Sequence, residues 1–483
     1  MHNSRRLICL VYIPLILAAL STAKSHAAPK PNVLLICVDD LKPTIGCFGD
    51  SFARTPNIDA LAKLGVRFES AYCNQAVCSP SRNALMTGLR PQTLGIYDLE
   101  THFRKAAPDV TTFSQYFIQH GYVAQSLGKI YHVGHGNIDD KQSWSTPSWR
   151  PRKPGYVLDS SLNSIVTDKK GKQRGPATES ADVPDDSYAD GDIADEAIKR
   201  LKTLSESPDQ PFFLAVGFMK PHLPFVAPQT YWDLYDADEL PMPKTIKPPT
   251  GAPSYAPTNF GELRNYSDMP EMGAIDEPTT RRLIHGYYAA TSYMDSQLGR
   301  VLVQAKALGL LDNTIVILWG DHGWHLGDHG MWCKHTNYEQ AARIPVIVAA
   351  PTGQKDQASS ALIESVDIFP TVAQLAGLPA PEGIDGRSFA SVIADPSSNA
   401  RPYVTHVYPR GQQIGRAIRD ARYRMVQWKV PGKPAESAEI ELYDYQDDPL
   451  ETINQADSQP QVVESMQALL AEHPESKKQY RGK

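Results

Sequence analysis

The stretch Val33-Leu34-Leu35-Ile36-Cys37-Val38-Asp39-Asp40 says most about the fold of this chain, because an unbroken apolar run ends directly at two acids. Such a run, without polar alternation, is typical of a strand buried on both faces of a sheet. A second stretch has the same form: Ile315–Trp319 is followed, after Gly320, by Asp321 and His322. The two stretches therefore predict buried strands that deliver charged side chains at their ends.

Further apolar runs of the same kind lie along the chain, at Tyr122–Leu127, Phe212–Phe218 and Ile344–Ala349. Helical patterns cover Thr280–Leu308 and Glu364–Leu375. Short buried strands that alternate with helices favour an α/β fold, in which helices flank a large, mostly parallel sheet.

The pattern changes near the C-terminus. Pro402–Tyr408, Gly415–Trp428 and Ile440–Tyr445 indicate antiparallel strands, and a last helix is expected near Val462–Leu470. We therefore predict a large α/β domain over residues 28–397 and a smaller α+β domain over residues 398–483.

The N-terminus has the pattern of a signal peptide. Arg5 and Arg6 precede the apolar run Leu7–Leu20, and Ser25-His26-Ala27 offers small residues for cleavage. We expect residues 1–27 to be removed and the protein to be exported, either to the periplasm or out of the cell. The apolar run is short for a membrane span, so we expect no stable membrane insertion. The formal net charge of −6 gives no reason to expect a nucleic-acid partner.

Ionisable side chains follow four of the predicted strands. Three carboxylates, three histidines and two lysines gather there: Asp39, Asp40, Asp321, His132, His222, His322, Lys129 and Lys220. Ligands of open α/β sheets bind beyond the carboxyl ends of the strands. Three carboxylates at one point require a cation, and oxygen ligands suit calcium or magnesium. Taken alone, each acid could equally be a solvated loop residue or a helix cap.

The segment Cys78-Ser79-Pro80-Ser81-Arg82 precedes a helical pattern. Proline favours the first turn of a helix, so Cys78 would lie at a helix N-terminus, where free N–H groups attract anions. Arg82, one turn further on, adds a guanidinium suited to an oxyanion. A disulfide between Cys73 and Cys78 is the alternative for this cysteine. Five cysteines follow residue 27, and an odd number leaves at least one unpaired or modified.

The C-x-P-x-R pattern of this segment resembles the maturation signature of the type I sulfatases, in the alkaline phosphatase superfamily. Within that family the chain is most similar to the iduronate-2-sulfatase group. The closer similarity rests on Leu41-Lys42-Pro43, Gly128–His132, Lys220–Phe225 and Asp321–Lys334. The resemblance implies an alkaline phosphatase-like fold.

The resemblance also implies a set of roles. Cys78 would be oxidised by a maturation enzyme to formylglycine, whose hydrate supplies the nucleophilic oxygen. Calcium would be bound by that oxygen together with Asp39, Asp40, Asp321 and His322. Arg82 would hold the modified residue, and Lys129 and Lys334 would bind the sulfate. His132 would assist breakdown of the sulfated intermediate, and His222 would protonate the leaving oxygen. Many sulfatases have asparagine where this chain has His322. The expected substrate is a sulfated oligosaccharide, with a 2-sulfated uronate or a related residue as the sugar.

Several residues keep two interpretations. Trp324 could be a platform for a sugar or a packed core residue. His325 and His329 could suggest a zinc site, although a pocket or surface position for His325 and a supporting position for His329 are the simpler expectations. The long polar stretches 135–210 and 237–277 could form binding walls or plain surface loops.

Two other functions compete with a sulfatase. A phosphonate or phosphate monoesterase of the same superfamily is the nearest enzymatic rival. The rival of another class is an exported, non-catalytic glycan-binding protein in which Cys78 stays a thiol or pairs with Cys73.

Overall fold

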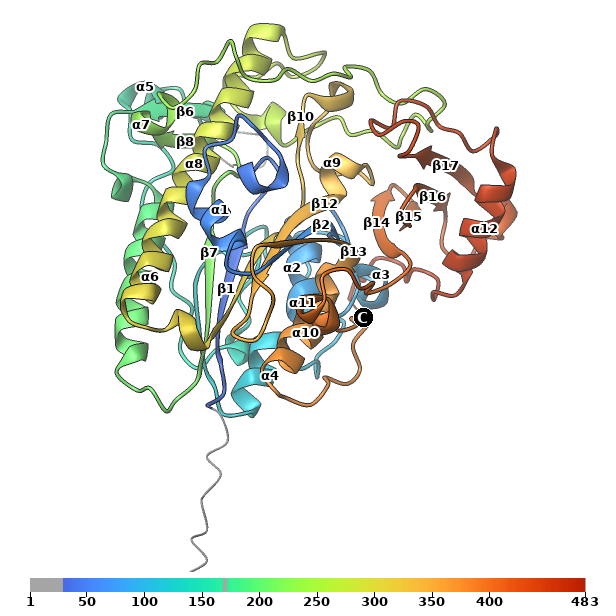
Figure 1. Ribbon diagram of the computed structural model, residues 1–483. Coiled ribbons are helices and arrows are strands. Elements are labelled where there is room, and N and C mark those ends of the chain that lie inside the picture. Colours follow the sequence, from blue (N-terminus) through green and yellow to red (C-terminus); the bar gives the residue numbers. More distant parts are fainter. Residues whose placement is uncertain (1–28, 168–170, 172, 483) are drawn as a thin grey trace, which may run out of the picture.

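A computed structural model describes residues 29–167, 171 and 173–482 of the chain (Figure 1). The predicted signal peptide lies outside the described residues. Among the helices of the described part, none has the length and apolar character needed to cross a membrane.

A seven-stranded sheet forms the centre of the molecule, in the order β13-β2-β12-β9-β1-β7-β3. Its strands are β1 (Asn32–Val38), β2 (Val66–Tyr72), β3 (Val123–Gly128), β7 (Phe212–Phe218), β9 (Thr314–Gly320), β12 (Arg343–Ala349) and β13 (Gln357–Glu364). All pairings are parallel except those of β12, which is antiparallel to both β9 and β2. The predicted α/β fold with a mostly parallel sheet is confirmed.

Helices cover both faces of this sheet (Figure 1). Alternate residues of β1 point to opposite faces. Val33, Leu35 and Cys37 pack in the core with α2 (Cys78–Thr87), α4 (Phe113–Gln119) and α10 (Ile368–Leu375). Leu34, Ile36 and Val38 pack in the core with α1 (Pro56–Ala62), α6 (Ala189–Ser205) and α8 (Glu277–Ala307). Burial on both faces explains why β1 is apolar from Val33 to Val38.

Shorter elements complete this part of the chain. They are α3 (Pro91–Leu94), α5 (Asp159–Asn163), α7 (Gln229–Trp232), α9 (Glu339–Ala342), α11 (Ala390–Ala394), β4 (Val166–Thr167), β5 (Gln173–Arg174), β6 (Thr178–Ala181), β8 (Phe225–Pro228), β10 (His325–Leu326) and β11 (Trp332–Cys333).

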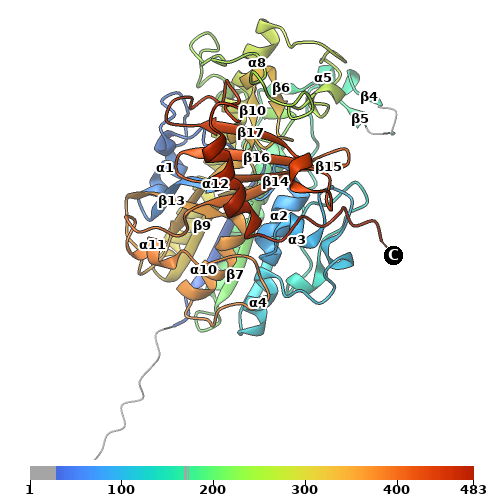
Figure 2. The ribbon, with the colours of Figure 1, turned by 90° about the vertical axis from the view of Figure 1, so that its right-hand side faces the viewer.

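The C-terminal part is a four-stranded antiparallel sheet covered by one helix (Figure 2). Its elements are β14 (Val404–Arg410), β15 (Gln413–Arg419), β16 (Tyr423–Lys429), β17 (Glu439–Asp444) and α12 (Pro460–Ala471). The range Gly415–Trp428, predicted as one strand, holds parts of two, because the chain turns at Asp420. The carboxylate of Asp420 accepts hydrogen bonds from the backbone N–H groups of Arg422 and Tyr423 and so closes that turn. The domain boundary at 397/398 stays a prediction.

A buried carboxylate at the end of β13 ties the two parts together. Glu364 accepts hydrogen bonds from Arg90 at 2.7 Å and from Arg401 at 2.6 Å. It also accepts from the backbone N–H of Thr405, in β14, and from the side chain of Asn74. Asn74 lies four residues before Cys78, so this cluster links the C-terminal sheet to the segment that carries the cysteine.

Candidate active site

The ends of β1 and β9 bring the predicted acids together. Val38 and Gly320 are neighbours in these parallel strands, so the next residues, Asp39 and Asp321, leave the sheet side by side. The backbone N–H of Asp40 donates to Oδ1 of Asp321 at 2.9 Å. Asp40 has a left-handed backbone (φ 61°), which turns the chain sharply at this edge.

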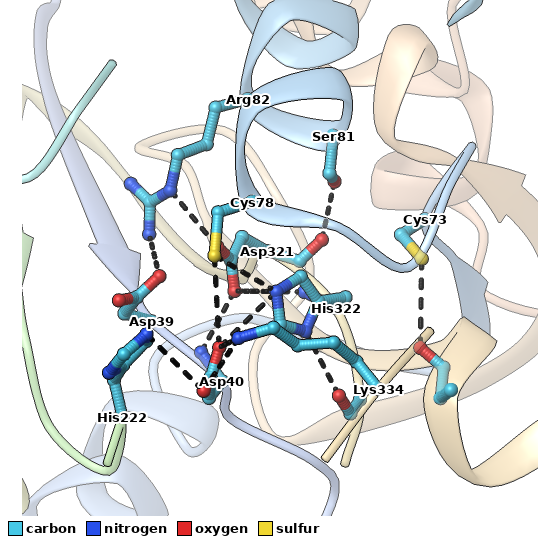
Figure 3. Close-up of polar contacts among 12 residues, drawn as sticks. Asp39, Asp40, Cys73, Cys78, Ser81, Arg82, His222, Asp321, His322 and Lys334 are labelled. Atoms are coloured by element: carbon cyan, nitrogen blue, oxygen red, sulfur yellow. Dashed lines mark hydrogen bonds and ion pairs between the residues drawn. The ribbon is translucent and has the colours of Figure 1, made fainter. Parts of the chain in front are cut away.

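Helix α2 places Cys78 next to these acids (Figure 3). The sulfur of Cys78 lies 3.4 Å from Nε2 of His322, 3.7 Å from Nζ of Lys129 and 4.0 Å from Oδ1 of Asp40. Every residue of α2 is buried, and Cys78 is 3% exposed. Cys78 is thus the first residue of a helix that points at the acidic end of the sheet.

Arg82 holds the acids of this cluster in place. Its Nε donates to Oδ2 of Asp321 and its Nη2 to Oδ1 of Asp39, both at 3.0 Å. The guanidinium also donates to the carbonyl groups of Lys129 and Ile130. Because it is fully buried and joined to two carboxylates, Arg82 fixes the ends of β1 and β9 relative to α2.

The residues predicted to bind metal offer a suitable set of ligand atoms. One atom each from Asp40, Cys78, Asp321 and His322 lies within 4.8 Å of the others, and a second such group joins Asp39, Asp40, Cys78 and His222. Nδ1 of His322 faces the carbonyl oxygen of Gly323 at 3.0 Å, so this atom carries the ring proton. In the neutral ring Nε2 then presents a lone pair toward the acids. A cation between them fits that arrangement.

The charges of the cluster also favour a bound cation. Burial opposes the ionisation of Asp39, but Lys129 and Arg82 hold its pKa well below the ordinary value. Burial raises the pKa of Asp321, although His322 and Arg82 offset part of this effect. The Asp321 carboxylate would therefore tend to bind a proton unless a metal cation took the place of that proton. Carboxylate oxygens with one imidazole suit a hard divalent ion, with the histidine as the unusual member.

Two lysines flank the cysteine. Lys129 forms an ion pair with Asp39, and Lys334 donates to Oδ1 of Asp40 at 2.9 Å. Lys334 also forms an ion pair with Glu262 at 3.1 Å. Both ammonium groups face the same small volume beside Cys78, where an oxyanion would be bound by fixed charges.

His222 and His132 border this volume from different sides. Nε2 of His222 lies 3.2 Å from Glu262 and 3.9 Å from Asp40. Nε2 of His132 lies 3.1 Å from Nδ1 of His135, and its own Nδ1 is buried without a hydrogen-bond partner among the described residues. Burial, assisted by Lys129, lowers the pKa of His132 to about 2, which keeps the free ring neutral.

Sequence reasoning missed Glu262. The residue lies in the polar stretch 237–277, where a single acid gives no signal of its own. Burial opposes its ionisation, but Lys334 and His222 hold its pKa well below the ordinary value. Glu262 therefore brings a negative charge from the insertion into contact with two predicted site residues.

Trp324 lies beneath the site rather than on its surface. The side chain is fully buried and packs edge-to-face with Phe225. The ammonium of Lys334 lies 5.1 Å from its ring centroid, within cation–π range. The geometry favours the packed-core alternative, in which Trp324 supports Lys334, over a direct sugar platform.

The remaining alternatives can be located as well. His325 is fully buried and bonds to Thr336, so it is neither a pocket nor a surface residue, and neither His325 nor His329 belongs to the metal-ligand groups found among the described residues. The five described cysteines are free, so Cys73 and Cys78 form no disulfide here.

The site opens into a cavity of about 670 Å³. Its lining includes Asp39, Cys78, Lys129, His132, His222 and Lys334. The polar stretches 135–210 and 237–277 also line it, through residues that include Arg150, Arg174 and Glu262. These insertions therefore form walls of the cavity.

Comparison with known proteins agrees with this geometry. The family model described as "Sulfatase" matches residues 31–378, and that of "N-sulphoglucosamine sulphohydrolase, C-terminal" matches residues 327–479. The chain is 36% identical to iduronate 2-sulfatase of Mus musculus, over 75% of this chain and 71% of the relative. It is 31% identical to a sulfatase of Formosa agariphila, over 91% of this chain and 86% of the relative.

Solved structures share the fold. One, a protein in complex with its substrate D-glucosamine-2-N,6-O-disulfate, has a TM-score of 0.72 at 23% identity and covers 92% of this chain and 97% of its own. A phosphonate monoester hydrolase from Silicibacter pomeroyi has a TM-score of 0.72 at 22% identity and covers 92% and 95%. Since the family model spans most of the chain and both relatives named above exceed 30% identity, the chain belongs to the sulfatase family and is a sulfuric ester hydrolase.

Proposed function

We propose that this enzyme hydrolyses a sulfate ester on a sulfated saccharide, with calcium as its metal and a formylglycine made from Cys78 as its nucleophile. The observation that carries the proposal is the position of Cys78, whose sulfur lies within about 4 Å of a metal-ligand group and a lysine.

An unmodified thiol fits this position poorly. Burial, together with the charge of Asp39, raises the pKa of Cys78 well above the ordinary value, so the side chain stays protonated. A protonated thiol is a weak nucleophile, and sulfur is a poor ligand for a hard cation. Converted to formylglycine, position 78 would instead supply an aldehyde whose hydrate is an oxygen nucleophile.

The other side chains have roles that follow from their places. Calcium, held by Asp39, Asp40, Asp321 and His322, would supply positive charge beside the reacting oxygens. Lys129 and Lys334 bind the sulfate, and Arg82 keeps the acids and α2 in register. His222 lies on the cavity side with Nε2 toward Glu262, where it can hold a proton for the leaving sugar oxygen. His132, neutral in the free protein, can accept a proton when sulfate is released.

The choice of sugar rests on the relatives. Two of them are named iduronate 2-sulfatase, and a solved structure with a TM-score of 0.69 is described as a 2-O GAG sulfatase. We therefore propose a 2-sulfated uronate or a related residue as the substrate. The N-terminal pattern supports export to the periplasm or the medium, and modification of Cys78 requires a maturation enzyme as a partner.

Peptide mass spectrometry of the segment Ser70–Arg82 from the native host tests the nucleophile. The aldehyde or its hydrate at position 78 supports the proposal, whereas unmodified cysteine contradicts it and favours a non-catalytic glycan-binding protein. Release of sulfate from a panel of defined sulfated saccharides tests the reaction. A strong preference for phosphate or phosphonate monoesters over these sulfates would favour the rival esterase activity.

A further inference from the structure

The cavity in front of Cys78 contains more positive charge than one sulfate requires. Six lysine and arginine side chains line it: Lys129, Arg150, Lys153, Arg174, Lys220 and Lys334. Four of these have oxygen partners on the protein. Lys129 and Lys334 contact the acids of the metal cluster, Lys153 lies 3.7 Å from Asp186, and Lys220 donates to two carbonyl groups at 2.8 and 2.7 Å.

Arg150 and Arg174 differ from the other four. Across residues 29–167, 171 and 173–482, neither guanidinium has an ion pair or a side-chain hydrogen bond. Both side chains are half-buried, and Nε of Arg174 is fully buried without a partner. A partly desolvated cation without an oxygen partner is uncommon, because burial costs it the hydrogen bonds that water would supply.

The fold holds both arginines at the cavity wall. Arg150 follows Trp149, whose carbonyl accepts a hydrogen bond from Gly128 at 2.9 Å, so Arg150 leaves the sheet edge beside the strand that leads to Lys129. Arg174 ends β5, and its guanidinium lies 5.3 Å from the ring centroid of Tyr266. Tyr266 belongs to the same insertion as Glu262, so the two polar insertions together position this charge.

We propose that Arg150 and Arg174 form a second anion-binding subsite, which takes an anionic group of the saccharide other than the sulfate that is cleaved. This inference rests on the function proposed above and narrows its substrate class to saccharides with at least two negative groups. A guanidinium presents N–H donors in a planar fork that matches a carboxylate or a sulfate, so either group suits an arginine of this cavity.

Substrates that differ in one anionic group test this subsite. The set is a 2-sulfated uronate, its carboxyl-reduced analogue, a disulfated hexose without a carboxylate, and an aryl sulfate whose only anionic group is the reacting sulfate. We expect Arg150→Gln and Arg174→Gln to lower kcat/KM for the substrates with two anionic groups by roughly tenfold to a hundredfold relative to the aryl sulfate, mainly through KM. Loss on the uronate identifies a carboxylate as the ligand, and loss on the disulfated hexose identifies a sulfate.

A binding measurement separates this proposal from the catalytic one. The Cys78→Ala protein, titrated calorimetrically with the unsulfated uronic acid, should bind it, and adding Arg174→Gln should weaken that binding by a similar factor. Arg174→Lys, which keeps the charge but loses the fork, should fall between wild type and Arg174→Gln. Arg281→Gln, which changes a half-buried arginine on α8 outside the cavity lining, is the matched control and should change neither measurement.

The outcomes are distinct. If no substrate is turned over but the arginine-dependent binding is found, the catalytic proposal fails and the subsite stands. If both glutamine variants fold, as judged by unchanged circular dichroism, and alter neither the substrate ratio nor the binding, the subsite does not exist.

Discussion

His322 directs Nε2 at Oδ1 of Asp40 across 3.2 Å, while its Nδ1 faces the carbonyl oxygen of Gly323 at 3.0 Å. With a proton on Nδ1 alone, Nε2 would face the carboxylate as a second acceptor, and a shared cation would turn both atoms into ligands. The pair is therefore organised for a metal ion.

Removal of divalent ions should abolish activity and lower the melting temperature. When the free concentration of an ion is about a hundred times its Kd, binding of that ion adds about 2.7 kcal/mol to the stability of the folded state. A chelator removes this contribution. Differential scanning calorimetry with and without EGTA, followed by addition of calcium or magnesium, measures the effect. Asp321→Asn should lose most of the calcium-dependent shift. A chelated enzyme with unchanged rate and melting temperature would contradict the metal assignment.

Cys78→Ala should abolish turnover, because Cys78 is the α2 residue whose side chain joins the metal-ligand groups. Cys73→Ala is the matched control, since Cys73 is equally buried but its sulfur makes only a weak contact with the carbonyl of Ala341, at 3.7 Å. Sulfate release by the two variants, purified from a host that matures sulfatases, makes the comparison. Retained activity in Cys78→Ala would remove the core of the proposed mechanism.

His222→Ala should slow poor leaving groups most. A positioned acid contributes roughly 10²–10⁴-fold when the leaving oxygen needs a proton, and little when the leaving group is an activated phenol. The ratio of kcat on a sulfated sugar to kcat on an aryl sulfate should therefore fall. An equal loss on both substrates would show that His222 acts in binding rather than as the acid.

Glu262→Gln should reproduce part of the effect of His222→Ala. The carboxylate contacts both His222 and Lys334, so its loss frees the imidazole and leaves Lys334 with Asp40 alone. We expect kcat on saccharides to fall by about tenfold, with a smaller effect on aryl sulfates. Glu271→Gln, exposed in the same insertion, serves as control. If the two glutamine variants behave alike, Glu262 has no role in the site.

Arg401→Gln should destabilise the protein by about 3–5 kcal/mol, because it leaves Glu364 with one fewer partner in a buried site. Burial opposes ionisation of Glu364, but Arg401 and Arg90 lower its pKa from 4.5 to about 2. A lowered pKa stabilises the fold above pH 4.5, and this contribution is lost as pH falls from 4.5 toward 2. Urea denaturation between pH 3 and pH 7 should show a shallower acid loss in the variant. Identical pH slopes would contradict this linkage.

The sequence predicts the strands of the site well, but it does not predict the direction of β12 or the turn at Asp420. After their first residues, β1 and β9 are apolar, as β7 is throughout, because both faces are covered, and the charged residues that follow these strands mark one edge of the sheet. The antiparallel direction of β12 leaves no trace in its sequence, since Ile344–Ala349 is as apolar as its parallel neighbours. The turn at Asp420 was missed because its flanking strands look continuous.

Side chains from the insertions were the least predictable part of the site. Glu262, Arg150 and Arg174 belong to polar stretches in which charged residues are common, and only the fold shows that they line one cavity. Trp324 illustrates the opposite difficulty, since an aromatic residue near catalytic residues has the same sequence signature on a surface as in a core.

The enclosure of α2 bears on the proposed maturation of Cys78. Every residue of α2 is buried, so a modifying enzyme would reach the backbone around position 78 only before the fold is complete. If Cys78 is oxidised as proposed, that oxidation would compete with folding of the new polypeptide, and molecules that folded first would keep an unmodified thiol. The yield of active enzyme in a given host would then depend on the relative rates of modification and folding.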